Sequence, residues 1–335
     1  MRTGNLSSTE YTPGTPYNDD PQRYLNDELA KISEAIRKLA AGHLDAVHVT
    51  PDKPRDGDIR YADGTNWNPG SGQGVYAYIN GRWEFLGVGN FYLDIAKGNI
   101  PGHSSIHKFG EAPDVDAADG YLQVWDGGIV NAALKNYTYS TTADITLVSS
   151  DSASDTFNLE VQGLDANYDL VIQTVALLGQ TQVSLATPLI RVFRMKNKGA
   201  TPTVGNVYCY ATDTATGGVP TTITNTRSIV RPTYNQTLMA LYTVPAGCTA
   251  YMTRFYATLS GPARAVVDLH QERRDFGGVF QAKYTGTLSG YSGQLEVVYD
   301  VPEAISEKTD IQMMVESDTN NTAVSSGFEL ILVKN

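Results

Sequence analysis

One short segment near the N-terminus limits the fold of this chain more than any other part of its sequence. Residues 20–39 read DPQRYLNDELAKISEAIRKL, and their apolar residues recur at intervals of four and three. These residues are Leu25, Leu29, Ile32, Ile36 and Leu39. Such spacing places one apolar seam along a helix, as in coiled coils. Asp20 can cap the first turn, Pro21 suits the first helical position and Gly42 suits the end, so we expect a helix over residues 20–42.

The apolar seam of this helix has two interpretations. An amphipathic helix can pack its seam on its own domain, or several copies of the chain can join their seams in a parallel coiled coil. We favour self-association, with a homotrimer as the expected state, although a mixture of Leu and Ile does not distinguish two strands from three. The acid-before-base pairs Asp27–Lys31 and Glu34–Lys38 should each stabilise the helix by about 0.3 kcal/mol.

The charge balance argues against two classes of partner. The chain has 335 residues, a formal net charge of −11 and a pI near 4.9, and no basic cluster longer than the pair Arg273-Arg274. We therefore expect neither a nucleic-acid groove nor binding to an anionic membrane. The run from Val171 to Leu178 is too short and polar to span a bilayer, and residues 1–12 lack the apolar core of a signal peptide.

Composition also indicates the compartment and the fold class. Cys209 and Cys248 are the only cysteines, too few for a disulfide framework, so we expect assembly in a reducing cytoplasm. Thr, Tyr, Val and Gly are abundant after residue 42 and helix formers are sparse, which predicts a mainly β body. Residues 1–19 are rich in Ser, Thr, Pro, Gly and Asn without periodicity. They should form a flexible arm, which either stays unstructured or orders along a partner protein.

Residues 43–88 predict a small β-hairpin module. Asn80-Gly81 is a strong signal for a two-residue hairpin turn. Pairing outward from this turn puts four aromatic side chains on one face, because strand side chains alternate between faces. These are Tyr76, Tyr78, Trp83 and Phe85. Such a face can stack on a sugar ring, but in so small a module it more often forms the core, which is the interpretation we favour.

Residues 89–136 show no regular pattern. We expect an irregular connecting segment, packed between domains or against a neighbouring subunit. His103 and His107 are four residues apart, a spacing that on a helix could ligate a metal. Because Pro101 and Gly102 argue against a helix there, we expect no metal at this pair.

The same segment contains an acidic run that loosely resembles a calcium loop. It consists of Asp114, Asp116, Asp119 and Gly120. It lacks the alternation and the distal bidentate Glu of an EF-hand. A solvated acidic turn is therefore the favoured interpretation, with calcium as the alternative.

Two β-domains are predicted in the rest of the chain. Short β-rich runs recur every 8 to 12 residues or so, separated by turn residues, which is typical of sandwiches. We expect one β-sandwich over residues 137–233 and a jelly-roll-like sandwich over residues 234–335. In the second domain, turns are expected at Pro245–Gly247 and Gly277-Gly278, and the chain should end inside its last strand.

Motifs of known enzymes are absent from the sequence. There is no G-x-S-x-G, HExxH, Walker loop or CxxC, so we expect no catalytic residues, no cofactor and no metal. A pair of carboxylates that cleaves glycosides forms in space and therefore stays open as an alternative.

Several segments resemble structural proteins of tailed bacteriophages. The segment YADGTNWNPGSGQGVYAYINGRWEFLG resembles a small module near the N-terminus of phage fibre-like proteins, where it follows a short helix. Four more segments, in chain order, are similar to parts of those virion proteins: GNIPGHSSIHKFGEAPDVDAADGYLQVWDGG, VQGLDANYDLVIQTVALLG, LYTVPAGCTAYMTRFYATL and EKTDIQMMVESDTNNTAVSSGFELILV. The resemblance covers most of the chain from about residue 20, carries no catalytic residues, and implies an oligomeric structural component of the particle.

Three functions follow from these observations. The first is a virion fibre or decoration protein, assembled in the bacterial cytoplasm, that attaches to other virion proteins by its N-terminal region and displays its β-domains outward. The second is a tail module that binds a host surface glycan. The third is an enzyme that degrades cell-wall or capsule polymer, which would need a site that the sequence does not show.

Overall fold

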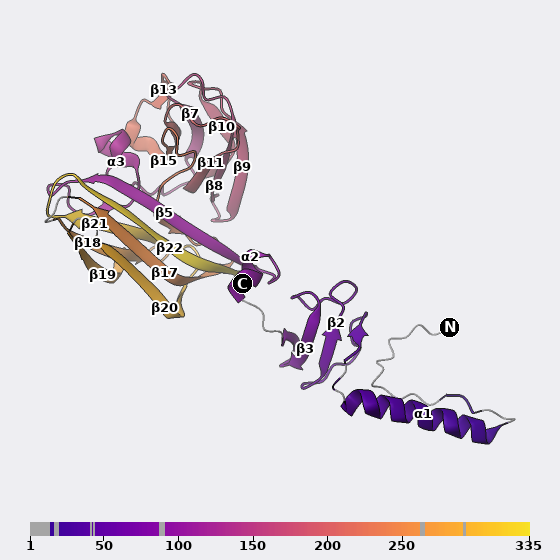
Figure 1. The fold of residues 1–335 in the computed structure, drawn as a ribbon. Coiled ribbons are helices and arrows are strands. Elements are labelled where there is room, and N and C mark those ends of the chain that lie inside the picture. Colours follow the sequence, from indigo (N-terminus) through magenta and orange to yellow (C-terminus); the bar gives the residue numbers. More distant parts are fainter. Residues whose placement is uncertain are drawn as a thin grey trace. The chain divides into compact units, whose positions relative to one another are not determined.

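The computed structural model describes residues 14–16, 20–40, 42, 44–86, 91–261, 265–290 and 293–335. Most of the expected arm over residues 1–19 therefore lies outside the described residues. The chain forms two compact units, residues 1–103 and 104–335, and each is described by itself. The fold is mainly β with one long helix, which confirms the predicted class (Figure 1).

The first unit begins with the predicted helix. Helix α1 spans Pro21–Ala40, and the Arg23 amide donates to the Asp20 carboxylate at 3.0 Å, so Asp20 caps the first turn as expected. Gly42 follows the helix with a φ of 67°, the left-handed conformation common just after helix ends. The side chain of Leu39, the last predicted seam residue, lies outside the description.

A four-stranded sheet and a short helix complete the first unit. The sheet order is β1-β2-β3-β4, with β1 at Ala46–Val47, β2 at Ile59–Ala62, β3 at Gly74–Ile79 and β4 at Arg82–Phe85. Helix α2 spans Phe91–Ala96. Asn80 and Gly81 form the β3–β4 turn with φ values of 51° and 82°, as expected for the primed turns that suit a twisted hairpin.

The second unit holds two β-sandwiches. The first sandwich has the sheets β10-β7-β12-β15 and β11-β8-β9. Its strands are β7 Ile145–Ser150, β8 Asn158–Leu164, β9 Leu170–Ala176, β10 Val183–Leu189, β11 Arg191–Asn197, β12 Val207–Ala211 and β15 Thr226–Val230. The short pair β13 Ala215–Thr216 and β14 Val219–Pro220 and the 3-10 helix η2 Ile223–Asn225 lie between β12 and β15. Buried residues of both sheets, among them Ile145, Leu159 and Val207, form one core cluster.

The second sandwich has larger sheets. One has the order β16-β21-β18-β19 with β6 also paired to β21, and the other has the order β20-β17-β22-β5. Its strands are β5 His103–Val115, β6 Leu122–Gln123, β16 Leu241–Thr243, β17 Cys248–Ser260, β18 Val266–Arg274, β19 Gln281–Ser289, β20 Gln294–Ile305, β21 Asp310–Ser317 and β22 Thr322–Lys334. The predicted turns after β16 and β18 are present, and the chain ends just beyond β22.

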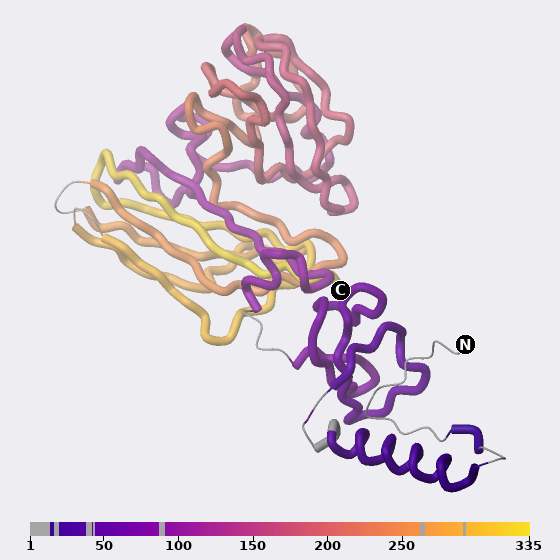
Figure 2. Tube along the Cα trace, turned by 45° about the vertical axis from the view of Figure 1, so that its right-hand side comes forward, coloured from indigo at the N-terminus to yellow at the C-terminus, as the bar shows by residue number. Residues whose placement is uncertain are grey.

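The segment 89–136 differs from the prediction of an irregular connection. It contains α2, helix α3 (Gly127–Val130), the 3-10 helix η1 (Ala132–Leu134), β6 and the 13-residue strand β5. Strand β5 lies beside β22 at one edge of its sheet, as both ribbon and tube views show (Figure 2). The usual alternation of apolar residues is hidden in β5, because its inward positions include Lys108, Gly110 and Ala112.

Strand β5 also changes how the two sandwiches relate along the chain. Because β5 and β6 belong to the second sandwich, the first sandwich is an insertion between β6 and β16. A buried cluster that includes Trp125, Tyr210 and Met239 connects the segment after β6 to the first sandwich. The chain therefore crosses twice between the sandwiches, which brings distant residues together where they meet.

Candidate functional site

The apolar seam of α1 is largely exposed within the described residues. Leu25, Leu29 and Ile36 are 51%, 54% and 60% exposed, and Ile32 is half-buried. Ion pairs of 2.6 Å join Glu28 to Lys31 and Glu34 to Arg37. Lys31 and Glu34 were predicted to pair with residues four positions away, but in these two ion pairs the partner is three positions away. An exposed apolar row on a helix is a surface that partner chains can cover.

The predicted register of the aromatic hairpin is present. Tyr76 pairs with Phe85 and Tyr78 with Trp83. Their rings form edge contacts, with centroids 5.2 Å apart in the first pair and 5.1 Å apart in the second. Trp67, from the loop after β2, adds a further ring 5.1 Å from that of Trp83.

These rings form the core of the module. Tyr76 is 1% exposed and Trp67 4%, and Trp83 and Phe85 pack against them. The Tyr76 hydroxyl donates to the Gly72 carbonyl and accepts from the Ser71 amide, both at 2.9 Å. The core interpretation of this face therefore fits the structure better than stacking on a sugar.

Asp63 holds the loop that delivers Trp67. Its carboxylate accepts hydrogen bonds from the amides of Thr65, Asn66 and Trp67 and contacts the His48 ring at 2.6 Å. The hydrogen bond from the Trp67 amide is the main cause of a lowered pKa of Asp63. The carboxylate thus has a structural task in fixing the loop.

The two histidines considered as metal ligands lie in strand β5 rather than on a helix. His107 Nε2 lies 2.9 Å from the Tyr256 hydroxyl, and His103 Nδ1 lies 3.0 Å from the Pro101 carbonyl oxygen. Burial is the main cause of a lowered pKa of His107. Within the described ranges, no group of three or more His, Cys, Asp or Glu side chains is arranged to hold a metal ion.

A lysine lies among the acidic residues considered as a calcium loop. Lys135 Nζ is 2.6 Å from Asp119, 3.4 Å from Asp116 and 4.0 Å from Asp114. Burial alone would raise the pKa of Asp119, but the hydrogen bond from Lys135 and its charge lower it overall. Gly120 has a φ of 67°, as a tight turn requires. The ammonium group thus provides the positive charge that calcium would bring.

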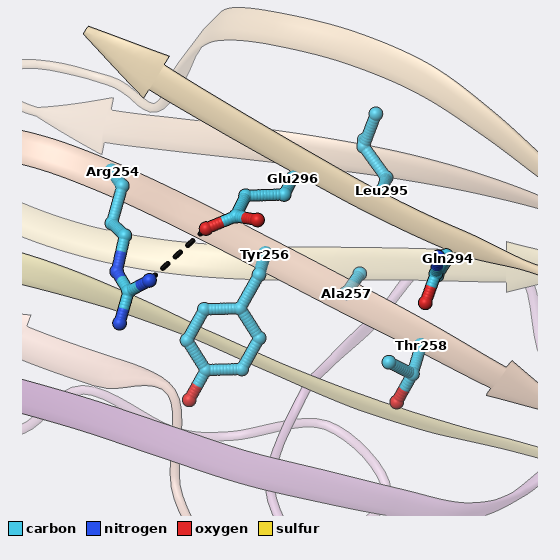
Figure 3. A pocket seen from close by; sticks show the side chains of 7 residues that line it. All are labelled: Arg254, Tyr256, Ala257, Thr258, Gln294, Leu295 and Glu296. Carbon is cyan, nitrogen blue, oxygen red and sulfur yellow. Dashed lines mark hydrogen bonds and ion pairs between the residues drawn. The ribbon is translucent and has the colours of Figure 1, made fainter.

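A hollow of about 470 Å³ lies on strands β17 and β20 of the second sandwich (Figure 3). Arg254 lies at one end of it and donates to Glu296 at 3.0 Å and to Glu329 at 2.7 Å. A Cβ atom at Gly327 would come within 2.6 Å of the Tyr256 hydroxyl, so only glycine leaves room for that ring. The guanidinium of this hollow is therefore already matched by two carboxylates.

A second concave site lies where the two sandwiches meet, and we call it the cleft. Its volume is about 270 Å³. Its lining comprises Tyr139, Ser140, Thr141, Tyr168, Arg191, Arg274, Asp275, Phe276, Gly277, Gly278, Lys308 and Asp310. These residues come from the segment before β7, the β8–β9 turn, β11, the β18–β19 hairpin and the start of β21.

Asp310 is the buried centre of the cleft. Its carboxylate accepts from Arg191 at 2.9 and 3.1 Å, from Arg274 at 3.0 and 2.6 Å, and from the Thr243 hydroxyl at 2.5 Å. Burial alone would lower the pKa of Arg191, but its hydrogen bonds to Asp310 raise it overall. One carboxylate thus links both sandwiches through two guanidinium groups.

Aromatic rings surround the cations of the cleft. The Arg274 guanidinium carbon is 4.7 Å from the Tyr139 ring centroid and 4.5 Å from that of Phe280. Lys308 Nζ is 5.9 Å from the Tyr168 ring centroid and 5.4 Å from that of Phe276. These distances are typical of cation–π contacts.

Two features of the sequence point to part of the cleft. Arg273-Arg274 is one of two adjacent basic pairs, the other being Arg37-Lys38, and Gly277-Gly278 marks the hairpin turn beside it. Neither signal indicates that Arg191 and Asp310, 119 residues apart, meet there. Cys209 and Cys248 lie elsewhere as free thiols, buried and half-buried respectively.

Comparisons with known proteins give little further information. No protein-family model matches the chain, and no curated protein sequence matches it. Among solved structures, the infectious bursal disease virus VP2 subviral particle is similar at 10% identity, over 89% of this chain and 76% of that chain, with a TM-score of 0.19. The structure of the Gt strain of that virus is similar at 8% identity, over 73% of this chain and 78% of that chain, with a TM-score of 0.18. TM-scores of this size do not establish a shared fold.

None of the described helices combines the length and the apolar character that crossing a bilayer would need.

Proposed function

We propose that this chain is a structural protein of a virus particle, a fibre or decoration protein of a tailed bacteriophage. It associates with copies of itself through α1 and with other virion proteins through the arm that precedes α1. The β-domains face outward. The proposal draws on the resemblance of several segments to phage virion proteins, on the mainly β fold, and on the net charge of −11, which suits a solvated surface better than one facing DNA.

The exposed seam of α1 is the observation that carries the proposal. Leu25, Leu29 and Ile36 are each more than half exposed, on a helix whose other faces bear ion pairs. Burying a leucine or isoleucine side chain gains about 1.5–3 kcal/mol, so a seam repeated in three chains would supply a large driving force. Two free cysteines suit assembly in a reducing bacterial cytoplasm before incorporation into the virion.

Light scattering of purified protein tests the oligomer. The double variant Leu29→Asp/Ile32→Asp should give monomers with folded β-domains, whereas the intact chain should give trimers. Asn26→Asp/Ser33→Asp adds the same charge to the same helix off the seam and should remain trimeric. An intact chain that is monomeric, or a seam variant that keeps its oligomer, would contradict self-association through α1.

The place in the virion needs a separate test. A gold-labelled tag fused after Asn335, which is exposed, should label intact purified particles of the virus that encodes the chain. Particles without the protein would overturn the virion role, even if α1 forms trimers. The proposed role is not enzymatic, so incubation with host polysaccharide should release no new reducing ends.

A further inference from the structure

The cleft between the sandwiches has an excess of positive charge in an acidic protein. Three cations line it, Arg191, Arg274 and Lys308, against two carboxylates, Asp275 and Asp310. Asp310 is taken up by the two arginines. Asp275 accepts from the Thr309 hydroxyl at 3.3 Å. Lys308 forms no ion pair with any residue in the described ranges, so the cleft offers an unmatched ammonium group.

The backbone at the cleft is held in an unusual conformation. Tyr168 and Lys308 have φ values of 68° and 60°, in the left-handed region that bulky residues rarely adopt. The Lys308 amide donates to the Val244 carbonyl at 2.7 Å, and the Tyr168 carbonyl accepts from the Ala246 amide at 2.9 Å. One segment, residues 244–246, thus fixes both residues. Strained positions of this kind cluster at binding sites, where they point to a function.

Flat apolar surfaces lie beside the unmatched ammonium group. The rings of Tyr168 and Phe276 meet edge to face at 88°, with centroids 5.6 Å apart. Phe276 is 65% exposed at the tip of the β18–β19 hairpin, and no described residue buries it. An exposed ring at the rim of a concave site is a surface on which the C–H face of a sugar can stack.

We propose that the cleft binds a sugar residue that carries a carboxylate, whether or not the chain is a virion component. The Lys308 ammonium pairs with the carboxylate, and the Phe276 and Tyr168 rings contact the sugar ring. The volume of about 270 Å³ is slightly below the range of about 300–1,000 Å³ for sites of drug-sized ligands, so one sugar residue suits it. Arg191 and Arg274 position the site through Asp310 and are not assigned a ligand contact.

An array of immobilised oligosaccharides tests the proposal with the full-length chain. It should contain oligosaccharides rich in uronic acid, the same molecules as methyl esters, and neutral oligosaccharides of matched length. Acidic oligosaccharides should be retained, and their esters should bind roughly tenfold more weakly, about 1.4 kcal/mol, because the ester lacks the charge with which Lys308 pairs. Retention of the acids should fall as salt is raised from low to physiological concentration.

Two variants assign the binding to the cleft. Lys308→Met should weaken binding of the acidic oligosaccharide roughly tenfold, and Phe276→Ala should weaken binding of acid and ester alike. Lys283→Met, at an exposed lysine on β19 in the same sandwich, should bind as the unaltered chain does. A cooperative thermal unfolding transition checks that each variant is folded. Because Phe276 is exposed, its replacement by Ala should leave the fold intact.

Three results would overturn the proposal. The first is an array on which no acidic oligosaccharide is retained. The second is equal binding of acid and ester, which would remove the role of charge. The third is unchanged binding by Lys308→Met, which would place the contact outside the cleft. An intact chain that is monomeric would contradict association through α1 and would leave the comparison of acid, ester and Lys308→Met unchanged, so the two proposals fail separately.

Discussion

Two lysines lie over aromatic rings where the first and second sandwiches meet, and their surroundings differ. Lys108 of β5 is 3% exposed, and its Nζ lies 5.6 Å from the Phe193 ring centroid and donates to the Phe193 carbonyl. Lys308 is half-buried at the rim of the cleft, over Tyr168 and Phe276. In the ranges that the structure describes, neither lysine forms an ion pair.

The difference between the two lysines is whether water reaches the ammonium group. A buried cation without a counter-ion loses hydration that one carbonyl and one ring repay only in part. Burial accordingly lowers the pKa of Lys108 well below its ordinary value of 10.5, and the nearby Arg194 lowers it further. Lys308 keeps contact with solvent, so an unmatched charge there costs little and stays available to a ligand. A lysine over an aromatic ring is therefore expected to lower stability at Lys108, whereas at Lys308 it presents a charge that a ligand can reach.

Removal of the carboxylate that organises the cleft should have the largest effect. Asp310→Asn should lower the free energy of unfolding by about 3–5 kcal/mol, because it leaves the buried Arg191 without its counter-ion. Urea unfolding followed by tryptophan fluorescence measures the change. Asp268→Asn, at an exposed carboxylate on β18, should change stability by less than about 0.5 kcal/mol. A loss below about 1 kcal/mol for Asp310→Asn would show that the arginines find other partners.

The sequence predicts a region well where the interacting residues lie close together along the chain. The α1 seam and the Asn80-Gly81 hairpin depend on residues close in the chain, and both appear as expected, down to the pairing of Tyr78 with Trp83. Trp67 also belongs to that core, but it arrives from a loop fixed by Asp63. The local sequence pattern predicts the hairpin but does not predict that the Trp67 ring completes its core.

Strand β5 and the cleft show what local patterns cannot supply. The inward positions of β5 include Lys108 and Gly110, so the strand carries no apolar alternation. The cleft depends on Arg191 of the first sandwich and Asp310 of the second meeting across 119 residues, which the packing of the two sandwiches brings about. Charged residues at such a junction look like ordinary surface residues until the strand order is known.

Replacement of the buried lysine should stabilise the protein. Lys108→Met keeps most of the volume and removes the buried charge, at the cost of one donor to the Phe193 carbonyl. We expect the free energy of unfolding to rise by about 1–2 kcal/mol, as in cores where apolar residues replace buried ionic groups. Lys196→Met, at an exposed lysine on β11, should leave it unchanged within about 0.5 kcal/mol. A less stable Lys108→Met protein would show that the contact with Phe193 outweighs the burial of charge.

The pH dependence of stability sharpens the same contrast. Because the folded state lowers the pKa of Lys108, the unfolded chain binds more protons between that lowered value and 10.5. Stability contributed by this group is therefore complete above 10.5 and is lost as pH falls through the folded-state pKa. The difference in stability between the unaltered chain and Lys108→Met should shift in favour of the unaltered chain as pH rises, by up to about 1.4 kcal/mol per pH unit. Denaturant titrations at a series of pH values measure it, and a difference independent of pH would mean that Lys108 titrates alike in both states.

The smallest change in stability is expected at Lys308. There a substitution should stabilise the fold and weaken ligand binding, so the two roles can be told apart. A left-handed backbone costs about 1–2 kcal/mol for a residue with a Cβ, whereas glycine pays about 0.5–1 kcal/mol in chain entropy. Lys308→Gly should therefore raise the free energy of unfolding by about 0.5–1 kcal/mol while it weakens binding of acidic oligosaccharides roughly tenfold, as Lys308→Met does. Asn321→Gly, at another left-handed position with a φ of 57°, is the matched control and should change neither, because asparagine tolerates this conformation. A destabilised Lys308→Gly protein would mean that the lysine packs for stability, as Asp310 does, and the contrast with Lys108 would then be lost.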